Sequence, residues 1–168
     1  LQHGLPRRQD DGAGPQQGRR HRKHQDHAAH PHAAARTAQV ILRFASLASG
    51  SGGNCLVAEA GATRLLIDCG LNLRDTEKRL ARLGLAPADL AGILITHEHG
   101  DHAGCAFDFA AAHRVTLYLT YGTLVALEAE GKVIEGVKKV LLTSTEQLAV
   151  GDLEIAPFTV PHDAREPV

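Results

Sequence analysis

Short apolar runs alternate with stretches of helical periodicity from residue 40 to residue 160. Apolar runs of about four to eight residues are typical of strands, and apolar positions repeated every three or four residues are typical of helices. The runs predict strands over residues 40–47, 55–59, 63–68, 93–95, 115–119, 140–142 and 153–160. The periodic stretches predict helices that begin after Asn72 and that cover residues 103–112 and 122–130. We therefore expect strands that alternate with helices.

Turn and cap residues mark the boundaries of several of these elements. Residues 60–62, with Gly61 at their centre, predict a hairpin between the second and third strands. Asn72 can cap the first helix and Gly84 can end it. The apolar face of this helix is predicted to comprise Leu73, Leu80 and Leu83. Residues 140–142 are short enough for an edge strand, and Pro157 indicates a bulge or an edge position in the last strand.

Composition divides the 168-residue chain near residue 38. Residues 1–38 contain six of the 11 histidines and carry a charge of +4, whereas residues 39–168 carry −5. The first part has only Leu1 and Leu5 as large apolar residues, so it cannot bury enough surface to offset the entropy of ordering it. We expect residues 1–38 to be a disordered or non-native leader and residues 39–168 to form one domain. The alternative is that the leader is an arm that scavenges metal or binds nucleic acid.

The same composition excludes several classes of protein. No uncharged apolar run reaches the roughly 18 residues that a membrane span needs, and no apolar stretch follows the basic residues of the leader as in a secretory signal. Cys55, Cys69 and Cys105 form no CxxC pair, which argues against a disulfide framework or a zinc ribbon and favours reduced thiols in the cytoplasm. An acidic domain is not typical of proteins that coat nucleic acids, although an enzyme needs only a local basic patch.

The strongest chemical signal is the segment from His97 to His102, which reads His-Glu-His-Gly-Asp-His between an apolar strand and a helix. Functional sites often lie on such loops. The segment offers four potential metal ligands, and imidazole combined with carboxylate suits zinc, manganese or iron. The alternative is a polar loop whose histidines bond to one another. The predicted ligands are His97, His99, Asp101 and His102.

Further candidates lie at the ends of other predicted strands. His162 follows the last apolar run and can supply the third imidazole of a three-histidine site, although a lone histidine is more often a surface or core residue. Asp68 either supports the ligand loop through hydrogen bonds or caps a turn. The glycine-rich loop after the first strand is either a tight turn or a phosphate cradle made of backbone N–H groups. Its candidate residues are Ser49, Ser51, Gly52, Gly53 and Asn54.

Several of these segments together resemble a known family. The three that carry the resemblance are residues 65–70, 96–102 and 160–163. In order and spacing they are similar to the first three motifs of the metallo-β-lactamase-fold hydrolases. Residues 47–54 and 161–168 resemble the small bacterial branch called YycJ or WalJ, which is regarded as DNA exonuclease-like. The resemblance covers residues 40–168 and implies an α+β fold, an αββα sandwich with metals at one edge, of which this chain holds the N-terminal part.

The resemblance also implies a set of ligands for two divalent ions, zinc or alternatively manganese or iron. His97, His99 and His162 would hold the first ion, Asp101 and His102 the second, with Asp68 as a structural aspartate. The family also uses a bridging aspartate and a last histidine from beyond the third motif, whereas this chain ends six residues after His162. We therefore expect an incomplete second site, and a chain that is inactive and poorly soluble as written.

The implied reaction is hydrolysis by an activated water, with Asp101 as a ligand and general base. We expect a phosphodiesterase, specifically a DNA exonuclease, with nucleic acid as its substrate. Lys132, Lys138 and Lys139 are candidate contacts to the phosphate backbone. A thioesterase or lactonase of the same fold would use the same ligands. A fragment that binds metal and catalyses nothing is the non-enzymatic alternative.

Overall fold

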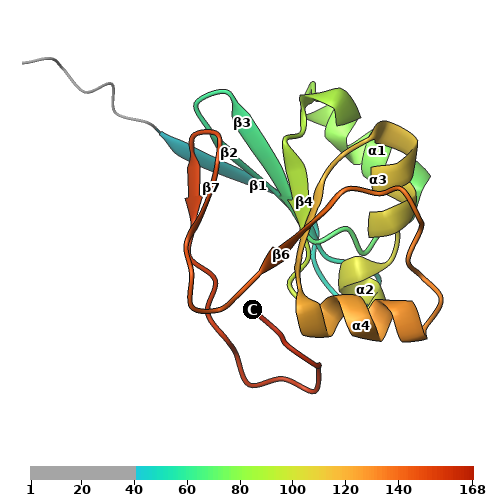
Figure 1. The fold of residues 1–168 in the computed structure, drawn as a ribbon. Helices are drawn as coiled ribbons and strands as arrows, with labels where there is room; N and C mark the ends of the chain where they lie inside the picture. The colour runs from blue at the N-terminus through green and yellow to red at the C-terminus, as the bar shows by residue number, and fades with distance from the viewer. Residues whose placement is uncertain (1–40) are drawn as a thin grey trace, which may run out of the picture. The chain divides into compact units, whose positions relative to one another are not determined.

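A computed structural model describes residues 41–168, so the expectations for the leader lie outside the described residues. A six-stranded sheet has the order β1-β2-β3-β4-β5-β6 (Figure 1). The strands are β1 (Leu42–Ala48), β2 (Cys55–Ala60), β3 (Thr63–Ile67), β4 (Gly92–Leu94), β5 (Leu117–Thr120) and β6 (Lys139–Leu142). The pairs β1–β2 and β2–β3 are antiparallel, and the pairs from β3 to β6 are parallel. The predicted α+β class is confirmed, and β6 lies at an edge of the described sheet as expected.

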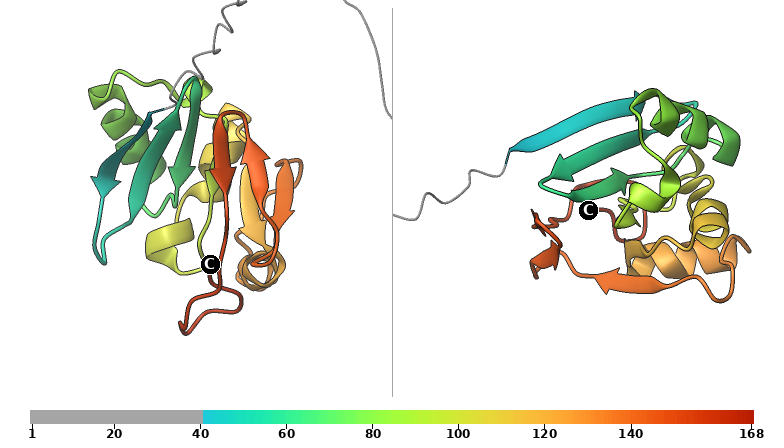
Figure 2. Two further views of the ribbon diagram at one scale, coloured as in Figure 1. Left: turned by 90° about the vertical axis from the view of Figure 1, so that its left-hand side faces the viewer. Right: turned by 90° about the horizontal axis from the view of Figure 1, so that it is seen from above.

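Helices cover one face of this sheet (Figures 1 and 2). They are α1 (Leu73–Arg82), α2 (Gly100–Ala103), α3 (Ala106–His113) and α4 (Tyr121–Ala129), with a short 3-10 turn, η1 (Pro87–Asp89). Because side chains alternate along a strand, Leu66 of β3 faces the helices while Leu65 faces away from them. The buried core on the helical side joins sheet and helix residues, among them Leu66, Leu80, Leu117, Phe109 and Leu127. This core anchors the sheet and the helices on that side to each other.

A two-stranded hairpin, β7 (Leu148–Val150) and β8 (Leu153–Ile155), packs on the opposite face of the sheet (Figure 2). Its buried contacts are Val150 and Leu153 against Ala60 and Leu65. Polar bonds fix the hairpin turn, because Asp152 N–H donates to Thr63 Oγ1 at 2.8 Å and Ala62 N–H donates to Asp152 Oδ2 at 3.0 Å. The hairpin therefore brings the segment after β8 back toward the sheet.

The first helix agrees with its predicted boundaries, but the leucines of its predicted apolar face are buried to different extents. Asn72 caps α1 by accepting a hydrogen bond from Asp75 N–H at 2.9 Å, and Gly84 follows the helix with a positive φ of 72°. Leu80 is fully buried, whereas Leu83, which was predicted on the same face, is 44% exposed. Leu83 is the C-cap residue, where the chain has left helical geometry and the 3.6-residue period no longer applies.

Two other predicted elements are wrong in extent. The helix expected over residues 103–112 is split into α2 and α3, because Gly104 packs against backbone and Cys105 N–H bonds to Cys69 O at 2.9 Å. The strand expected over residues 153–160 ends at Ile155, and β7 was not predicted. Proline at residues 157 and 161 removes ladder donors from the segment that follows β8.

None of the helices between residues 41 and 168 has the length and apolar character that crossing a membrane requires. All three cysteines of the described domain are buried and free. The Sγ atoms of Cys69 and Cys105 lie 3.3 Å apart beneath the strand ends.

Candidate metal centre

The predicted ligands gather where two parallel strands end. Asp68 follows β3, and the loop from Thr96 to His99 follows β4, the neighbouring strand. Because parallel strands end at the same edge of a sheet, these segments meet there. Asp101 and His102 follow this loop directly in the sequence and lie in the short helix α2.

The backbone of α2 is held by two loops from other strands. Asn54 N–H, after β1, donates to Asp101 O at 2.6 Å, and Cys69 N–H, after β3, donates to His102 O at 2.7 Å. Gly70 packs so closely that a Cβ there would overlap the Asp101 carbonyl. Any side chain at residue 70 would therefore displace α2 and both of its candidate ligands.

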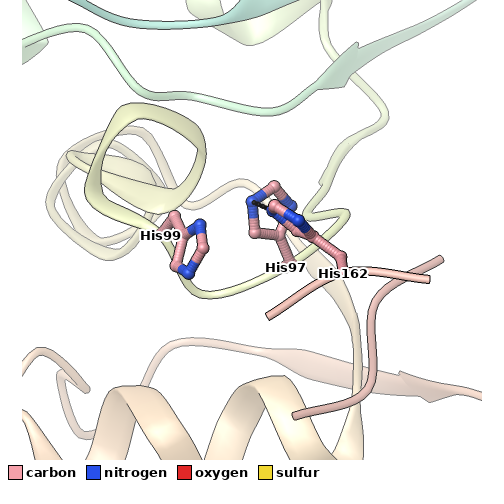
Figure 3. Close-up of side chains that lie close together, drawn as sticks. All are labelled: His97, His99 and His162. Carbon is pink, nitrogen blue, oxygen red and sulfur yellow. Dashed lines mark hydrogen bonds between the residues drawn. The ribbon is translucent and has the colours of Figure 1, made fainter. Parts of the chain in front are cut away.

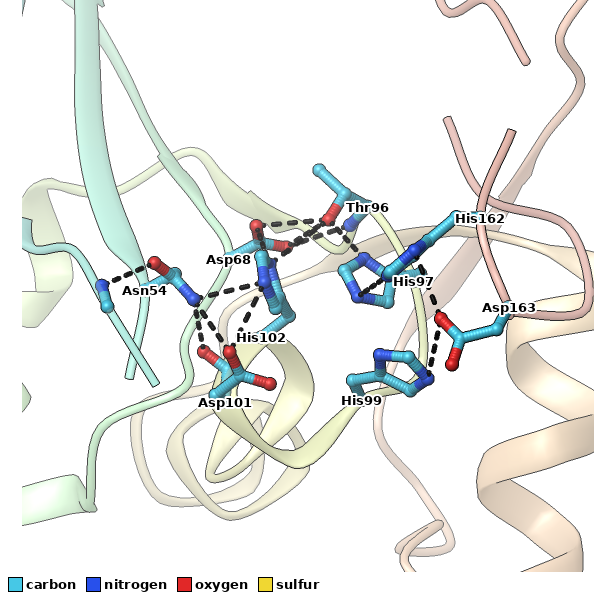
Figure 4. Close-up of polar contacts among 10 residues, drawn as sticks. Asn54, Asp68, Thr96, His97, His99, Asp101, His102, His162 and Asp163 are labelled. Carbon is cyan, nitrogen blue, oxygen red and sulfur yellow. Dashed lines mark hydrogen bonds and ion pairs between the residues drawn. The ribbon is translucent and has the colours of Figure 1, made fainter. Parts of the chain in front are cut away.

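Asp68 connects the two ligand segments through its buried carboxylate. Oδ1 accepts the Thr96 N–H and hydroxyl, each at 2.9 Å, and Oδ2 lies 2.7 Å from His102 Nδ1 (Figure 4). Burial raises the pKa of Asp68, and the hydrogen bonds from Thr96 and His102 oppose that rise. Its backbone adopts a left-handed φ of 61°, which aims the carboxylate at the loop. These contacts go beyond a turn cap and fit a role in orienting ligands.

His97, His99 and His162 form a cluster in which one ligand atom from each lies within 4.8 Å of the others (Figure 3). Nε2 of His97 and Nε2 of His162 are 3.2 Å apart although the residues are far apart in the sequence. His97 is buried, whereas the side chains of His99 and His162 are 37% and 39% exposed. The cluster is therefore anchored in the protein and open on one side.

The hydrogen-bond partners of these rings determine which nitrogens carry protons. His97 Nδ1 lies 3.0 Å from the Thr96 hydroxyl oxygen, whose own proton goes to Asp68. His97 Nδ1 therefore donates, and its Nε2 presents a lone pair toward His162 Nε2, which lies at hydrogen-bond distance. His162 Nδ1 lies 3.1 Å from an Asp163 carboxylate oxygen, an electrostatic contact. A buried imidazole lone pair with two further imidazoles close by is a donor set that fits a divalent metal such as zinc.

The charge state of His97 agrees with this interpretation. Burial, together with the nearby rings of His102, His99 and His162, lowers the pKa of His97 to about 4. His97 is therefore neutral at pH 7, and a neutral imidazole is the form that binds metal.

Asp101 and His102 form a second pair beside the cluster, with Asp101 Oδ2 lying 3.6 Å from His102 Nε2. The rings of His97 and His102 have centroids 4.1 Å apart, so the pair adjoins the three-histidine cluster. Nδ2 of Asn54 lies 3.0 Å from both Asp101 Oδ2 and His102 Nε2 (Figure 4). All five predicted ligands thus lie in one place, and Asn54 contacts two of them.

Residues 48–166 match the sequence model of the metallo-β-lactamase superfamily. This chain belongs to that superfamily.

Relatives within the superfamily include nucleases. The chain is 35% identical over 127 residues to the exodeoxyribonuclease YycJ of Bacillus anthracis, covering 76% of this chain and 48% of that protein. It is also 35% identical over 132 residues to the exodeoxyribonuclease WalJ of Streptococcus pneumoniae, covering 77% and 49%. A ribonuclease Z of Methanopyrus kandleri is 27% identical over 114 residues, with 64% and 39% covered. The chain thus spans about half the length of the exodeoxyribonucleases it matches.

Solved structures of the superfamily share this fold. A subclass B3 metallo-β-lactamase of Bradyrhizobium japonicum superimposes with a TM-score of 0.64 at 20% identity, covering 77% of this chain and 53% of that one. At this identity the similarity concerns the fold alone.

In the glycine-rich loop, several backbone N–H groups donate hydrogen bonds within the protein. Gly50 N–H donates to Asn54 Oδ1 at 2.9 Å, and Gly53 N–H donates to Gly50 O at 3.0 Å. Asn54 N–H is committed to the Asp101 carbonyl. These three groups are therefore not available to a phosphate, and a phosphate contact from Ser49, Ser51 or Gly52 stays a prediction.

The lysines expected to contact phosphate have other neighbours. Lys132 Nζ pairs with Glu130 at 2.6 Å, and Lys139 Nζ lies 5.8 Å from the centre of the Phe107 ring. The charge of Lys132 is thus balanced in part by Glu130.

Sequence reasoning missed the residues that hold the segment around His162. Glu98 is buried, and its Oε1 accepts the Arg165 N–H at 2.7 Å. Glu166 Oε2 accepts Gly122 N–H at 2.7 Å in the first turn of α4. Glu98 Oε2 has no hydrogen-bond partner among the described residues. A glutamate flanked by two ligands in a polar segment is expected to face solvent, so the pattern carried no signal for this contact.

Replacing Glu98 with alanine should lower the affinity of the three-histidine cluster for a divalent ion roughly ten- to a hundredfold. The change removes the acceptor of Arg165 N–H and frees the segment that carries His162. Glu98→Gln keeps an oxygen acceptor and should bind nearly as tightly as the wild type. A chromogenic chelator in competition with the protein measures both affinities. Equal affinities for the alanine variant and the wild type would show that Glu98 does not position His162.

Proposed function

We propose that this domain belongs to a metal-dependent phosphodiesterase that degrades DNA from its ends. The observation that carries the metal dependence is the cluster of His97, His99 and His162, in which the Nε2 atoms of His97 and His162 are 3.2 Å apart and the other nitrogen of His97 is committed as a donor. Two relatives that bear the name exodeoxyribonuclease, each 35% identical, support the choice of substrate.

The proposed centre takes two divalent cations. His97, His99 and His162 would hold the first ion, and Asp101 and His102 would contribute to the second. Zinc suits this combination of imidazole and carboxylate, with manganese and iron as alternatives. When bound, such ions supply Lewis acidity that activates water and offsets the charge developing on an attacked phosphate.

The residues around the ions have separate tasks in this proposal. Asp101 would contribute one carboxylate oxygen to the second ion, which leaves the other to accept a hydrogen bond, and then a proton, from the attacking water. Asp68 keeps His102 in the tautomer that presents Nε2. The partial exposure of His99 and His162 supports access for the end of a polymer. The buried free cysteines support a reducing compartment, and we propose the cytoplasm.

A panel of substrates tests the reaction class. The protein expressed from its complete open reading frame, loaded with Zn²⁺ or Mn²⁺, should release nucleotides from end-labelled DNA and leave a closed circle of the same sequence intact. Cleavage of the circle would contradict an exonuclease. Hydrolysis of a thioester or a lactone, with DNA untouched, would replace the proposed substrate by one of the two alternatives on the same fold. Metal binding without turnover of any substrate would favour a non-catalytic fragment.

A further inference from the structure

Asn54 is placed so that both ends of its amide are in use. Oδ1 accepts the Gly50 N–H at 2.9 Å, which identifies the oxygen end of the amide. The other end, Nδ2, lies 3.0 Å from Asp101 Oδ2 and 3.0 Å from His102 Nε2 (Figure 4). Nδ2 also lies 3.3 Å from the Asp101 carbonyl oxygen, which already accepts the Asn54 backbone N–H, so we assign the two NH₂ protons to the two closer acceptors.

The acceptor atoms on Asp101 and His102 are the ones that a cation would need. His102 Nδ1 lies 2.7 Å from the Asp68 carboxylate and therefore carries the ring proton, which leaves one lone pair on Nε2. That lone pair lies in the ring plane and serves one partner at a time. It accepts from Asn54 in this structure, so the same lone pair cannot bind a cation until Asn54 moves.

We propose that the Asn54 amide is a built-in competitor of the second cation, so that this ion binds to Asp101 and His102 only when Nδ2 is displaced. The inference rests on the proposed function, because the competitor acts on the second ion of that centre. In the absence of the ion, the amide satisfies Asp101 Oδ2 and His102 Nε2 with hydrogen bonds.

Displacement of the amide would also change the loop from residue 49 to residue 54. Asn54 Oδ1 holds the Gly50 N–H, so moving the side chain releases a bond inside the loop. Rotating the amide in place would bring two N–H groups together at Gly50, because Nδ2 would replace Oδ1 there. The second ion therefore binds at the expense of loop order, and the loop responds to the occupancy of the second site.

Substitution of Asn54 distinguishes an amide that competes with the second ion from an amide that supports binding of that ion. If the amide competes, Asn54→Ala should tighten binding of the second ion about tenfold, the factor that corresponds to one charge-assisted hydrogen bond. Asn54→Asp keeps an oxygen for Gly50 N–H, loses both donors and adds a negative charge, so it should tighten binding at least as much. Asn72→Ala is the matched control, because it removes an asparagine that caps α1 and should change neither ion.

The experiment follows Zn²⁺ binding to the full chain, with free Zn²⁺ set by a chelator buffer. Imidazole ¹⁵N resonances of His97 and His102 report the first and the second ion separately, and they distinguish both from ions on the histidines of residues 1–38. Before Zn²⁺ is added, Asn54→Ala should shift the resonance of His102 Nε2 and leave that of His102 Nδ1 in place.

Each outcome bears on a different statement. If His97 does not respond to Zn²⁺ in the wild type, the proposed function fails. If His97 responds and the second ion binds more weakly, or equally, in both Asn54 variants, the competition is refuted while the proposed function stands. A His102 resonance that never responds to Zn²⁺ in either variant refutes the competition as well.

Discussion

Replacing both His97 and His99 with alanine should lower the affinity of this chain for its first metal ion by more than about a hundredfold. Substitution of residues that only support a ligand already costs about ten- to a hundredfold, and this change removes two of three imidazoles. Elemental analysis of protein purified without a histidine tag and without residues 1–38 measures the retained metal. That deletion matters because residues 1–38 contain six histidines.

His113→Ala provides the matched control for this double variant. His113 is an imidazole outside the cluster, and its Nε2 pairs with Glu77 at 2.9 Å. The control should keep the metal content of the wild type. A folded wild-type domain that holds no transition metal and cannot be reloaded would contradict the metal centre itself.

Asp101→Ala should reduce the turnover of DNA at least about a hundredfold, because one change removes both a ligand and the acceptor of the nucleophile's proton. Initial rates of nucleotide release by the protein from the complete open reading frame measure the effect. Asp108→Ala is the control, since Asp108 is an exposed carboxylate on α3. A variant that retains most of its turnover would remove Asp101 from the mechanism and leave the three-histidine cluster unaffected.

The sequence predicted those features of the site that depend on local spacing. His97, His99, Asp101 and His102 lie within six residues, so a loop after a strand brings them together whatever the rest of the chain does. His162 was predicted because it follows an apolar run and the loop already offered two imidazoles, and the resemblance implied the same role. By itself a lone histidine is a weak signal for a partner 65 residues away.

The features that were missed depend on tertiary contacts. The contact of Asn54 with Asp101 spans 47 residues, and the same side chain had been assigned to a phosphate loop. The break between α2 and α3 arises because Cys105 N–H bonds to Cys69 O rather than within a helix. Strand β7 was missed because three residues are too few for an alternation to stand out. In the first two cases a distant partner decided the local conformation.

The three-histidine cluster brings together two segments that are far apart in the sequence. One is the loop that carries His97 and His99, and the other is the segment that carries His162. An ion that binds His99 and His162 together would act as a reversible cross-link, closing a loop of roughly sixty residues as a disulfide does. In the chain-entropy model such a closure disfavours the unfolded ensemble by about 4 kcal/mol. The ion would then stabilise the fold of the segment that carries His162 as well as take part in the reaction. Removal of the ion would lower the stability of that segment and abolish the activity together.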